Sequence, residues 1–393
     1  MAGRNSDRYG QAFYGLDGAE LSVTSLVLSE ALYAILAGTD PKAIECFVDV
    51  TVGGVAVPYL ESITIERGLS DQMGTCRLTV LCTSDAVPAG IAENAAVIVT
   101  AGVKFGTGTA SQQVFAGRVD NWTPPDRGKI RGTLTAYDDA KRMDDDTVSG
   151  TMSGDLATWL GTETSTLSMG STFSIVQKGA AVTIPTTYSL TGFRSLLDAA
   201  KAMVSALDMR YLFFSGAGDL VLFDPDYADD TADPQFTFDR VISFREMANT
   251  SQRFNRIGYS NYIGYAHDFV TFTLTVNPGG ANSIQASEIS TVAIISGTYN
   301  DAEDQAIYGI LDLPGGVQNN ICATDGELSA YAASVAAESQ RSKFSLSVRF
   351  NPFLELGQKH LYGTTNGFVG RLRHNLTAGQ LWTSDVEFWE ATA

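Results

Sequence analysis

The stretch VFAGRVDNWTPPDRGKIRGTLTAYDDAKRMDDD, residues 114–146, carries the pattern that decides the fold. Its first nine residues alternate apolar and polar side chains, as a half-buried strand does. TPPDRGK contains two prolines and a glycine, which favour a turn, and IRGTLTAYDD follows as a returning strand. We therefore predict an antiparallel hairpin whose second strand ends at Asp138 and Asp139, where the chain leaves the sheet.

The segment before this hairpin, residues 44–100, has the same two-residue period. IECFVDVTVGGVAVPYLESITIERG alternates around Gly53-Gly54, which marks a hairpin turn. CRLTVLC and NAAVIVTAGVKF continue the alternation. GTGTASQ, residues 106–112, matches the beginning of a dinucleotide-binding fingerprint, but that fingerprint must open a helix. A strand follows here, so we predict a hairpin turn instead.

Residues 148–235 change in character and predict a small α/β insert. SGDLATWLGTE indicates a short helix with Ser153 or Asp155 as its N-cap. GFRSLLDAAKAMVSALD, residues 192–208, has apolar side chains at i, i+3 and i+4 spacing, which is typical of an amphipathic helix. MRYLFF and DLVLFD, on either side of SGAG, predict a β-hairpin directly after that helix.

The β pattern returns after residue 236, so the fold class that we predict is mainly β with an α/β insert. Two β-barrel domains flank the insert. The first spans 41–147, and strands at 236–250 could complete it; the insert spans 148–235. The second spans 251–393 and contains a helix near 326–342.

The first 40 residues stand apart from these domains as an N-terminal arm or helix. The run LSVTSLVLSEALYAILAG, residues 21–38, is interrupted by Glu30 and is short of the roughly 20 apolar residues of a bilayer span. We interpret it as an amphipathic helix or a docking arm and expect no membrane insertion.

Composition excludes several classes of protein. The formal net charge is −18, with 26 Lys and Arg against 44 Asp and Glu. Nucleic-acid binders need cations to replace counterions at the phosphates, so this balance argues against that class. The four cysteines, Cys46, Cys76, Cys82 and Cys322, are too few and too scattered for a disulfide scaffold or a zinc site. Buried free thiols in a reducing cytoplasm are the expectation.

Catalytic motifs are missing from the sequence. The three histidines, His267, His360 and His374, form no HxH, HExxH or obvious triad with a nearby nucleophile. We expect structural histidines, and we expect no catalytic residue, no cofactor and no dedicated metal site.

Two acidic runs are the remaining candidates for a site. Asp144, Asp145 and Asp146 are consecutive, so they cannot converge on one face of a strand or helix. A calcium loop beginning at Asp224 would need Gly and Glu where Asp229 and Gln235 stand, which leaves only a fortuitous calcium site as an alternative. We expect solvated or channel-facing acidic loops that contain Asp144, Asp145, Asp146, Asp224, Asp226, Asp229 and Asp230.

The order of these segments resembles the phage tail hub family, which includes baseplate hub, tail-tip and late-control-D-like proteins. VFAGRVDNW with LTAYDDAKRM resembles the family's "F-x-G-x-V" strand and its return. GFRSLLDAAKAMVSALDMRYLFFSGAGDLVLFDPD resembles the family's helix and hairpin. FREMANTSQRFNRIGYSNY is similar to the strand that opens the second barrel. FNPFLELGQKHLYGTTNGFVGRLRHNLTAGQLWTSDVEF is similar to "P-x-L-x-x-G" followed by "v-x-x-H-x-L".

The resemblance implies a non-enzymatic homotrimer whose six barrels form a pseudo-sixfold ring. Such a ring joins the sixfold tail tube to a threefold spike or fibre at the virion tail tip or baseplate, after assembly in the host cytoplasm. Implied partners are a tail tube or distal tail protein, a tape-measure protein, and a spike or fibre protein. DNA would pass through without being bound, and the charge of −18 per copy suits that role.

Two other classes of function stay open at this point. A β-rich carbohydrate-binding adhesin or receptor-binding module could use the 4 Trp and 15 Tyr residues to stack on sugars. A hydrolase could use the acidic runs at Asp144–Asp146 or at Asp224 and Asp226. Glycan binding would favour the first class, and loss of turnover on polysaccharide after removal of these carboxylates would favour the second.

Overall fold

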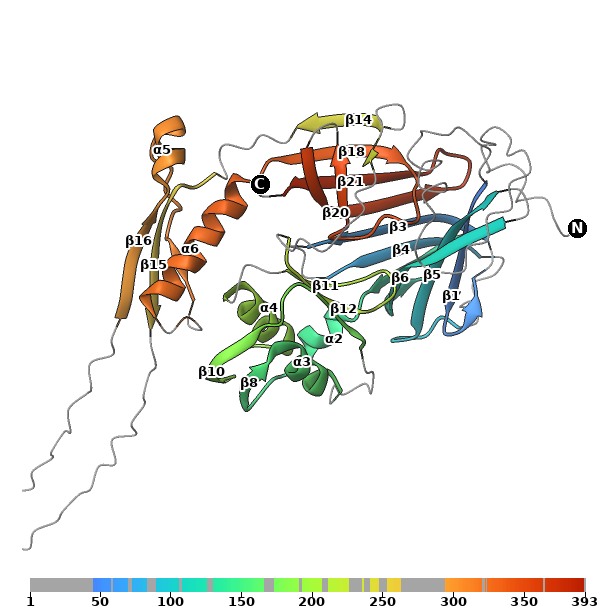
Figure 1. Ribbon diagram of the computed structural model, residues 1–393. Coiled ribbons are helices and arrows are strands. Elements are labelled where there is room, and N and C mark those ends of the chain that lie inside the picture. The colour runs from blue at the N-terminus through green and yellow to red at the C-terminus, as the bar shows by residue number, and fades with distance from the viewer. Residues whose placement is uncertain are drawn as a thin grey trace, which may run out of the picture. The chain divides into compact units, whose positions relative to one another are not determined.

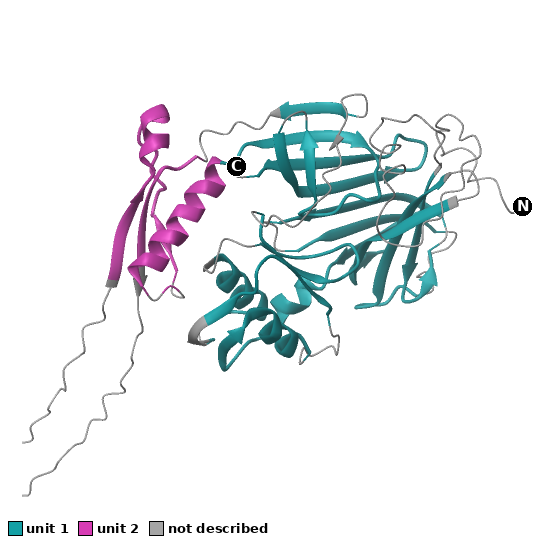
Figure 2. Ribbon diagram, viewed as in Figure 1, with its two compact units in different colours: residues 1–249, 341–393 teal, residues 250–340 magenta. Residues whose placement is uncertain are grey.

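The computed structural model describes most of the chain outside the first 44 residues. The described residues are 45–57, 59–69, 73–82, 90–105, 108–125, 130–165, 173–190, 193–206, 211–225, 235–236, 241–246, 253–262, 294–319, 322, 324–362 and 365–391. The chain forms two compact units, which Figure 2 shows in different colours. Unit 1 contains residues 1–249 and 341–393, and unit 2 contains residues 250–340.

A 13-stranded sheet forms the body of unit 1 within the described residues (Figure 1). Its main path runs β14-β18-β21-β20-β3-β4-β7-β6-β5-β1-β2, with β19 paired to β20 and β13 to β19. The first seven strands are β1 (Glu45–Val52), β2 (Val55–Ala56), β3 (Leu60–Gly68), β4 (Thr75–Leu81), β5 (Ala96–Phe105), β6 (Gly108–Thr123) and β7 (Arg131–Tyr137). The others are β13 (Gln235–Phe236), β14 (Val241–Glu246), β18 (Lys343–Arg349), β19 (Lys359–Tyr362), β20 (Thr365–Thr377) and β21 (Thr383–Glu390).

The hairpins predicted from the sequence are confirmed. Gly53 and Gly54 have φ angles of 57° and 77°, and Val52 pairs with Val55 across this two-residue turn. Positive φ at both central positions is what a type I′ turn requires, and glycine adopts it without steric cost. β6 and β7 pair antiparallel, so the stretch at 114–137 is the expected hairpin.

Two hydrophobic cores lie along this one sheet. The first is built by β1 and β3–β7 and includes Ile65, Leu78 and Phe115, none of them more than 2% exposed. The second is built by β18–β21 and includes Phe368 and Phe388. The two halves join where β20 pairs with β3. Alternating burial along each strand follows from the alternating sequence, because successive side chains point to opposite faces.

The α/β insert belongs to unit 1 and packs on the second core. Helix α2 (Ala140–Asp145) leads into the insert from β7. The insert itself contains β8 (Thr151–Asp155), α3 (Leu156–Ser165), β9 (Ile175–Lys178), β10 (Thr183–Ser189), α4 (Leu196–Ala206), β11 (Tyr211–Phe214) and β12 (Leu220–Phe223). Asp155 is the N-cap of α3, because its Oδ1 accepts from the backbone N–H of Thr158 at 2.8 Å. Phe213, Val221 and Phe223 of the β11–β12 hairpin are members of the second core. The predicted mainly β fold with an α/β insert is confirmed.

Unit 2 is a small α/β body. Its strands are β15 (Arg256–Tyr262), β16 (Ile294–Asn300) and β17 (Val317–Gln318), and its helices are α5 (Ala302–Tyr308) and α6 (Asp325–Gln340). Helix α6 was predicted at 326–342, and it packs on β15 and β16 through Leu328, Ala332 and Ala336. Small alanines on the buried face allow the helix to approach the strands closely.

The compact units divide the C-terminal region differently from the expected 251–393 domain. Residues 250–340 form unit 2, whereas β18–β21 extend the sheet of unit 1. Strand pairing partners more than 300 residues apart cannot be read from local periodicity, which explains the difference. The two-barrel division stays a prediction. The N-terminal arm at 1–40 lies outside the described residues, and each described helix is too short or too polar to cross a bilayer.

Candidate functional site: the junction of sheet and insert

The acidic end of the opening stretch is a short helix, which corrects the loop that we expected for Asp144 and Asp145. Helix α2 begins directly after β7 and covers both residues, and Asp146 is its C-cap. The Oδ1 atom of Asp138 accepts a hydrogen bond from the N–H of Ala140 at 3.1 Å, which holds the first turn. A six-residue helix is too short to give a periodic signal in the sequence.

The three consecutive aspartates have different environments. Asp144 Oδ1 accepts from Arg194 Nη2 at 2.6 Å and from Ser195 Oγ at 3.1 Å, which ties α2 to the start of α4. Asp145 is 60% exposed and pairs with Lys141 one turn earlier. The carbonyl of Asp146 accepts from the N–H of Leu196. Asp144 is therefore a structural link, and a channel-facing role for the run stays a prediction.

The second acidic run is described only at its beginning. Asp224 directly follows β12, and its N–H donates to the carbonyl of Lys178 at 2.9 Å. Asp226, Asp229 and Asp230 lie outside the described residues. Across the part of the chain that the structure describes, no cluster of His, Cys, Asp and Glu could hold a metal ion.

A part-buried ion pair, which the sequence did not reveal, lies where the insert meets the sheet. Arg67 of β3 is 2% exposed, and its Nη1 lies 2.5 Å from Oε1 of Glu355 in the loop before β19. The other carboxylate oxygen, Oε2, accepts from the N–H of Gly216 in the β11–β12 turn at 3.1 Å. A Cβ at Gly216 would lie 2.7 Å from the carbonyl oxygen of Gln113, so only glycine fits there.

A second buried carboxylate, Asp138, lies beside the same arginine. Its Oδ2 accepts from the N–H of Gly74 at 2.7 Å, and its side chain is 5% exposed. A Cβ at Gly74 would lie 2.6 Å from that oxygen and 3.0 Å from Cγ of Arg67. Burial raises the pKa of Asp138 to about 7, although its hydrogen bonds and the charge of Arg67 act in the opposite direction. We call Arg67, Gly74, Asp138, Gly216 and Glu355 the junction network.

Two hollows border the junction network. One is a cavity of about 10 Å³, roughly the space of a single water, lined by Arg67, Asp138 and apolar side chains of α4, β11 and β12. The other is a cleft of about 360 Å³ whose lining is rich in charge. Its residues are Glu93, Asn94, Arg118, Val119, Asp120, Tyr137, Asp138, Lys141, Arg142 and Asp145.

A histidine and a serine form a hydrogen-bonded pair in the sheet, but the pair is sealed. Nδ1 of His374 lies 2.9 Å from Oγ of Ser384, and both residues are 0% exposed. Burial and the charge of Arg67 lower the pKa of His374 to about 3. A neutral imidazole without access to substrate cannot activate a nucleophile for an external reaction, so this pair is structural. His360 is also buried, and His267 lies outside the described residues.

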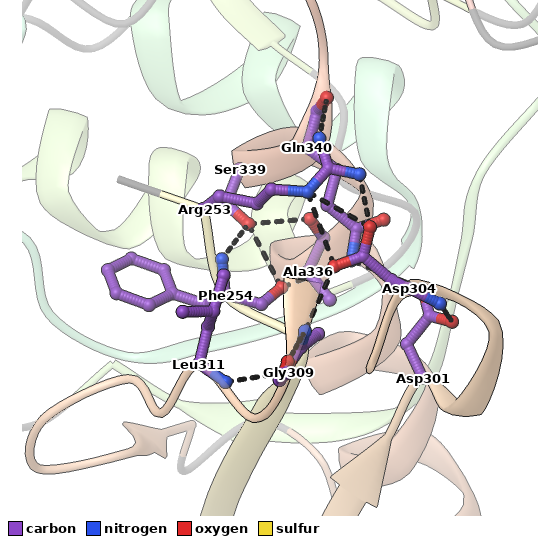
Figure 3. Close-up of polar contacts among 10 residues, drawn as sticks. Arg253, Phe254, Asp301, Asp304, Gly309, Leu311, Ala336, Ser339 and Gln340 are labelled. Atoms are coloured by element: carbon purple, nitrogen blue, oxygen red, sulfur yellow. Dashed lines mark hydrogen bonds and ion pairs between the residues drawn. The ribbon is translucent and has the colours of Figure 1, made fainter. Parts of the chain in front are cut away.

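Unit 2 contains its own polar network, centred on Asp304 of α5 (Figure 3). The guanidinium of Arg253 donates to both carboxylate oxygens of Asp304 and lies over the ring of Tyr308. Nδ2 of Asn255 donates to Asp304 Oδ2 at 3.0 Å and to the carbonyl of Gly309 at 2.7 Å, while its Oδ1 accepts from the N–H of Leu311. The network fixes the chain after α5 to the start of β15.

The geometry of both networks suits mechanical connection. Their polar and charged side chains bind backbone groups from segments that are far apart in the sequence. No local motif marks them, because each partner comes from a different strand or turn. The glycines at 74 and 216 are the only signal that sequence reasoning could have used.

Solved structures of tail proteins have a fold similar to that of this chain. The 43 kDa tail protein of prophage MuSo2 from Shewanella oneidensis is 12% identical, with a TM-score of 0.62, and the match covers 88% of this chain and 98% of that one. The tail protein from Neisseria meningitidis MC58 is 11% identical, with a TM-score of 0.59, covering 88% and 96%. No family model and no curated protein matches the sequence.

A third similar structure is the E. coli c3393 protein. It is a component of the type VI secretion system with structural similarity to the T4 bacteriophage tail proteins gp27 and gp5. It is 6% identical to this chain, with a TM-score of 0.50, and the match covers 87% of this chain and 77% of that one. At these identities the likeness establishes the fold, and that fold is the one of tail proteins and hub-like proteins.

Proposed function

We propose that this chain, which has a phage tail hub-like fold, is a structural hub at the distal end of a phage tail or of a related contractile device. Three copies form a ring that joins the sixfold tail tube to a threefold spike or fibre. Its neighbours in the assembly are a tail tube or distal tail protein, a tape-measure protein, and the spike or fibre protein. The observation that carries the proposal is the likeness to a tail protein over 98% of that protein's length.

The internal organisation of unit 1 supports a pseudo-sixfold arrangement. Each chain contains two half-sheets with separate cores, joined through the β3–β20 pair. Three copies would therefore supply six comparable half-sheets around one axis. This is how a threefold assembly could match a sixfold tube without a second type of subunit.

Charge supports passage of DNA without binding. Three copies would carry a net charge of −54, three times −18. Because salt screens charges beyond about 8 Å at physiological ionic strength, only carboxylates near the channel wall would repel DNA. Asp145 on α2, which is 60% exposed and pairs with Lys141, is the most exposed described member of the acidic runs.

Exposed apolar side chains support contact with neighbours. In unit 2, Ile307, Tyr308 and Ile310 are 73%, 49% and 57% exposed within a run of four residues. Contiguous exposed apolar groups mark sites of protein association. We propose a non-enzymatic role, supported by the sealed His374–Ser384 pair and by the structural use of the buried carboxylates.

The direct test is the mass of the purified protein in solution. A trimer of the 41.9 kDa chain has a mass of about 126 kDa by light scattering or native mass spectrometry. Particle classes in electron micrographs should show a ring with a central opening. A stable monomer that joins no ring when mixed with tail tube and spike proteins would contradict the proposal, and glycan binding by that monomer would favour the adhesin alternative.

A further inference from the structure

Four distant segments of unit 1 meet at the junction network. They are the chain before β4 at Gly74, the β7–α2 connection at Asp138, the β11–β12 turn at Gly216 and the loop before β19 at Glu355. Each carboxylate accepts the N–H of a glycine whose position has no room for a side chain. The arrangement is therefore closely fitted around Asp138 and Glu355, and it attaches the insert to both halves of the sheet.

The charges at the junction are unequal. Arg67 is the buried cation, and its Nη1 bonds to Glu355. Asp138 is held by two backbone N–H groups, at 2.7 and 3.1 Å, and has no ion pair among the described residues. When both carboxylates are ionised, two negative charges share one guanidinium, and Asp138, which is 5% exposed against 23% for Glu355, has the less contact with water. Removing an uncompensated charge from water is costly, so the site favours the state with one proton bound.

The other cations around Asp138 pair with other carboxylates. Arg118 and Arg142 lie 3.5 Å from Oδ1 of Asp139, whose own charge also raises the pKa of Asp138, and Lys141 pairs with Asp145. His374, which is near Arg67, stays neutral because it is buried. The remaining charged residues line the cleft that Asp138 borders, and they are Glu93, Asp120, Lys141 and Asp145.

We propose that Asp138 is a protonation-controlled latch that holds the start of α2 to the sheet, at the point where the chain leads into the insert. With a proton on Asp138, the charges of Glu355 and Arg67 balance in the junction network. The four segments then stay together. Loss of that proton leaves a buried carboxylate that has no ion pair among the described residues, and its charge is relieved when Asp138 takes up water through the bordering cleft. Water then competes with the bonds from Gly74 and Ala140, and the start of α2 loosens.

The transition falls near neutral pH, since burial raises the pKa of Asp138 to about 7. This latch is independent of the proposed hub function, because all its residues lie within unit 1 of one chain. For a hub, it would make the insert easier to move above neutrality than below it.

Hydrogen exchange of the full-length protein from pH 5 to pH 8.5, corrected for intrinsic exchange, tests the latch. We expect protection of the segments around Gly74 and Ala140 to fall by up to about tenfold per pH unit as the pH rises towards 7, because the opened site has the ordinary carboxyl pKa of 3.8, and to level off above pH 7. In Asp138→Asn this pH dependence should disappear. The matched control, Asp145→Asn, changes an exposed carboxylate at the other end of α2 and should keep the wild-type dependence.

A second measurement covers the case in which Asp138→Asn does not fold. Aspartate-specific ¹³C labelling follows the carboxyl resonances of the wild-type chain, whose mass is monitored across the same pH range. A buried aspartate carboxyl titrating near pH 7 supports the latch. Titration of every aspartate near pH 4, or protection at Gly74 that is independent of pH, would overturn it whether or not the protein is a trimer.

Discussion

The ring of Phe223, at the end of β12, packs edge-on against the ring of Phe368 in β20, with 5.6 Å between ring centroids. One residue belongs to the insert and the other to the second half-sheet, and both are fully buried in the same core. The insert hairpin is therefore part of the core of unit 1 and is not a decoration on its surface.

Truncation of Phe223 should destabilise the whole of unit 1. We expect Phe223→Ala to lower the free energy of unfolding by about 3–5 kcal/mol, because it leaves a cavity under β20 and removes aromatic contacts. Chemical denaturation followed by tryptophan fluorescence measures the change. Phe244→Ala is the control, since Phe244 is 48% exposed on the edge strand β14 and should cost much less. Equal losses in the two variants would refute the shared core.

The Arg67–Glu355 pair should show strong coupling. Glu355→Gln leaves the buried guanidinium without its counter-charge, and we expect a loss of about 3 kcal/mol, the lower end for buried pairs because Glu355 is 23% exposed. The double variant, Arg67→Met with Glu355→Gln, should lose less free energy of unfolding than the two single variants lose in sum. A double-mutant cycle in urea measures this coupling, and strict additivity would show that the two residues act independently.

Unit 2 should lose stability in acid through Asp304. Hydrogen bonds from Arg253 lower the pKa of Asp304 below its ordinary value of 3.8. The stabilisation is therefore complete above about pH 4 and is lost as the pH falls through the lowered pKa. We expect Asp304→Asn to cost about 1.5–3 kcal/mol at pH 7 and progressively less at pH 3. Hydrogen exchange of α5 follows unit 2 separately from unit 1.

The control for this prediction is Asp312→Asn. Asp312 also pairs with an arginine, Arg256, and its pKa is also lowered, but the pair is exposed to solvent. Screening should leave this substitution with little effect at either pH. If both variants showed the same loss in acid, burial of the Asp304 network would not be its cause.

Substitution by alanine should affect stability differently at Asp144 and at Asp145. Asp144 is 17% exposed and links α2 to Arg194 and Ser195, so Asp144→Ala should cost about 1 kcal/mol. Asp145 forms an exposed pair with Lys141, and Asp145→Ala should change stability by no more than about 0.5 kcal/mol. Thermal unfolding of the two variants decides whether Asp144 is a structural link or the whole run is solvated. If all three aspartates were solvated, the two substitutions would shift the melting temperature equally.

The local sequence pattern was sufficient to predict the hairpin turns and the amphipathic helices of this fold. Gly53-Gly54 predicted the β1–β2 turn, and the spacing of Leu196, Ala200 and Val204 predicted α4, because turn geometry and helical amphipathicity depend on neighbours in the sequence. Pairing between distant strands has no such local signal. The junction network depends on that pairing, so neither the burial of Arg67 nor the raised pKa of Asp138 could be predicted.

The conformation of the acidic run at Asp144–Asp146 could not be predicted from local sequence either. Asp144 and Asp145 have low helix propensity, and a run of three aspartates favours a loop on composition alone. The structure makes α2 because Asp138 holds the amide of Ala140 and because Arg194 and Ser195 receive Asp144. Tertiary contacts therefore decided the conformation of the residues that first suggested a site.

The join between β3 and β20 also sets an order of events during synthesis. Arg371 of β20 bonds to Glu66 of β3, and 305 residues separate them. The ribosome must release β20 before the outer edge of β3 finds its neighbour, while unit 2 lies wholly within the intervening segment. A nascent chain that ends before β20 exposes an unpaired edge of β3, and pairing with β20 closes that edge. The continuous sheet therefore forms only after β20 has been made.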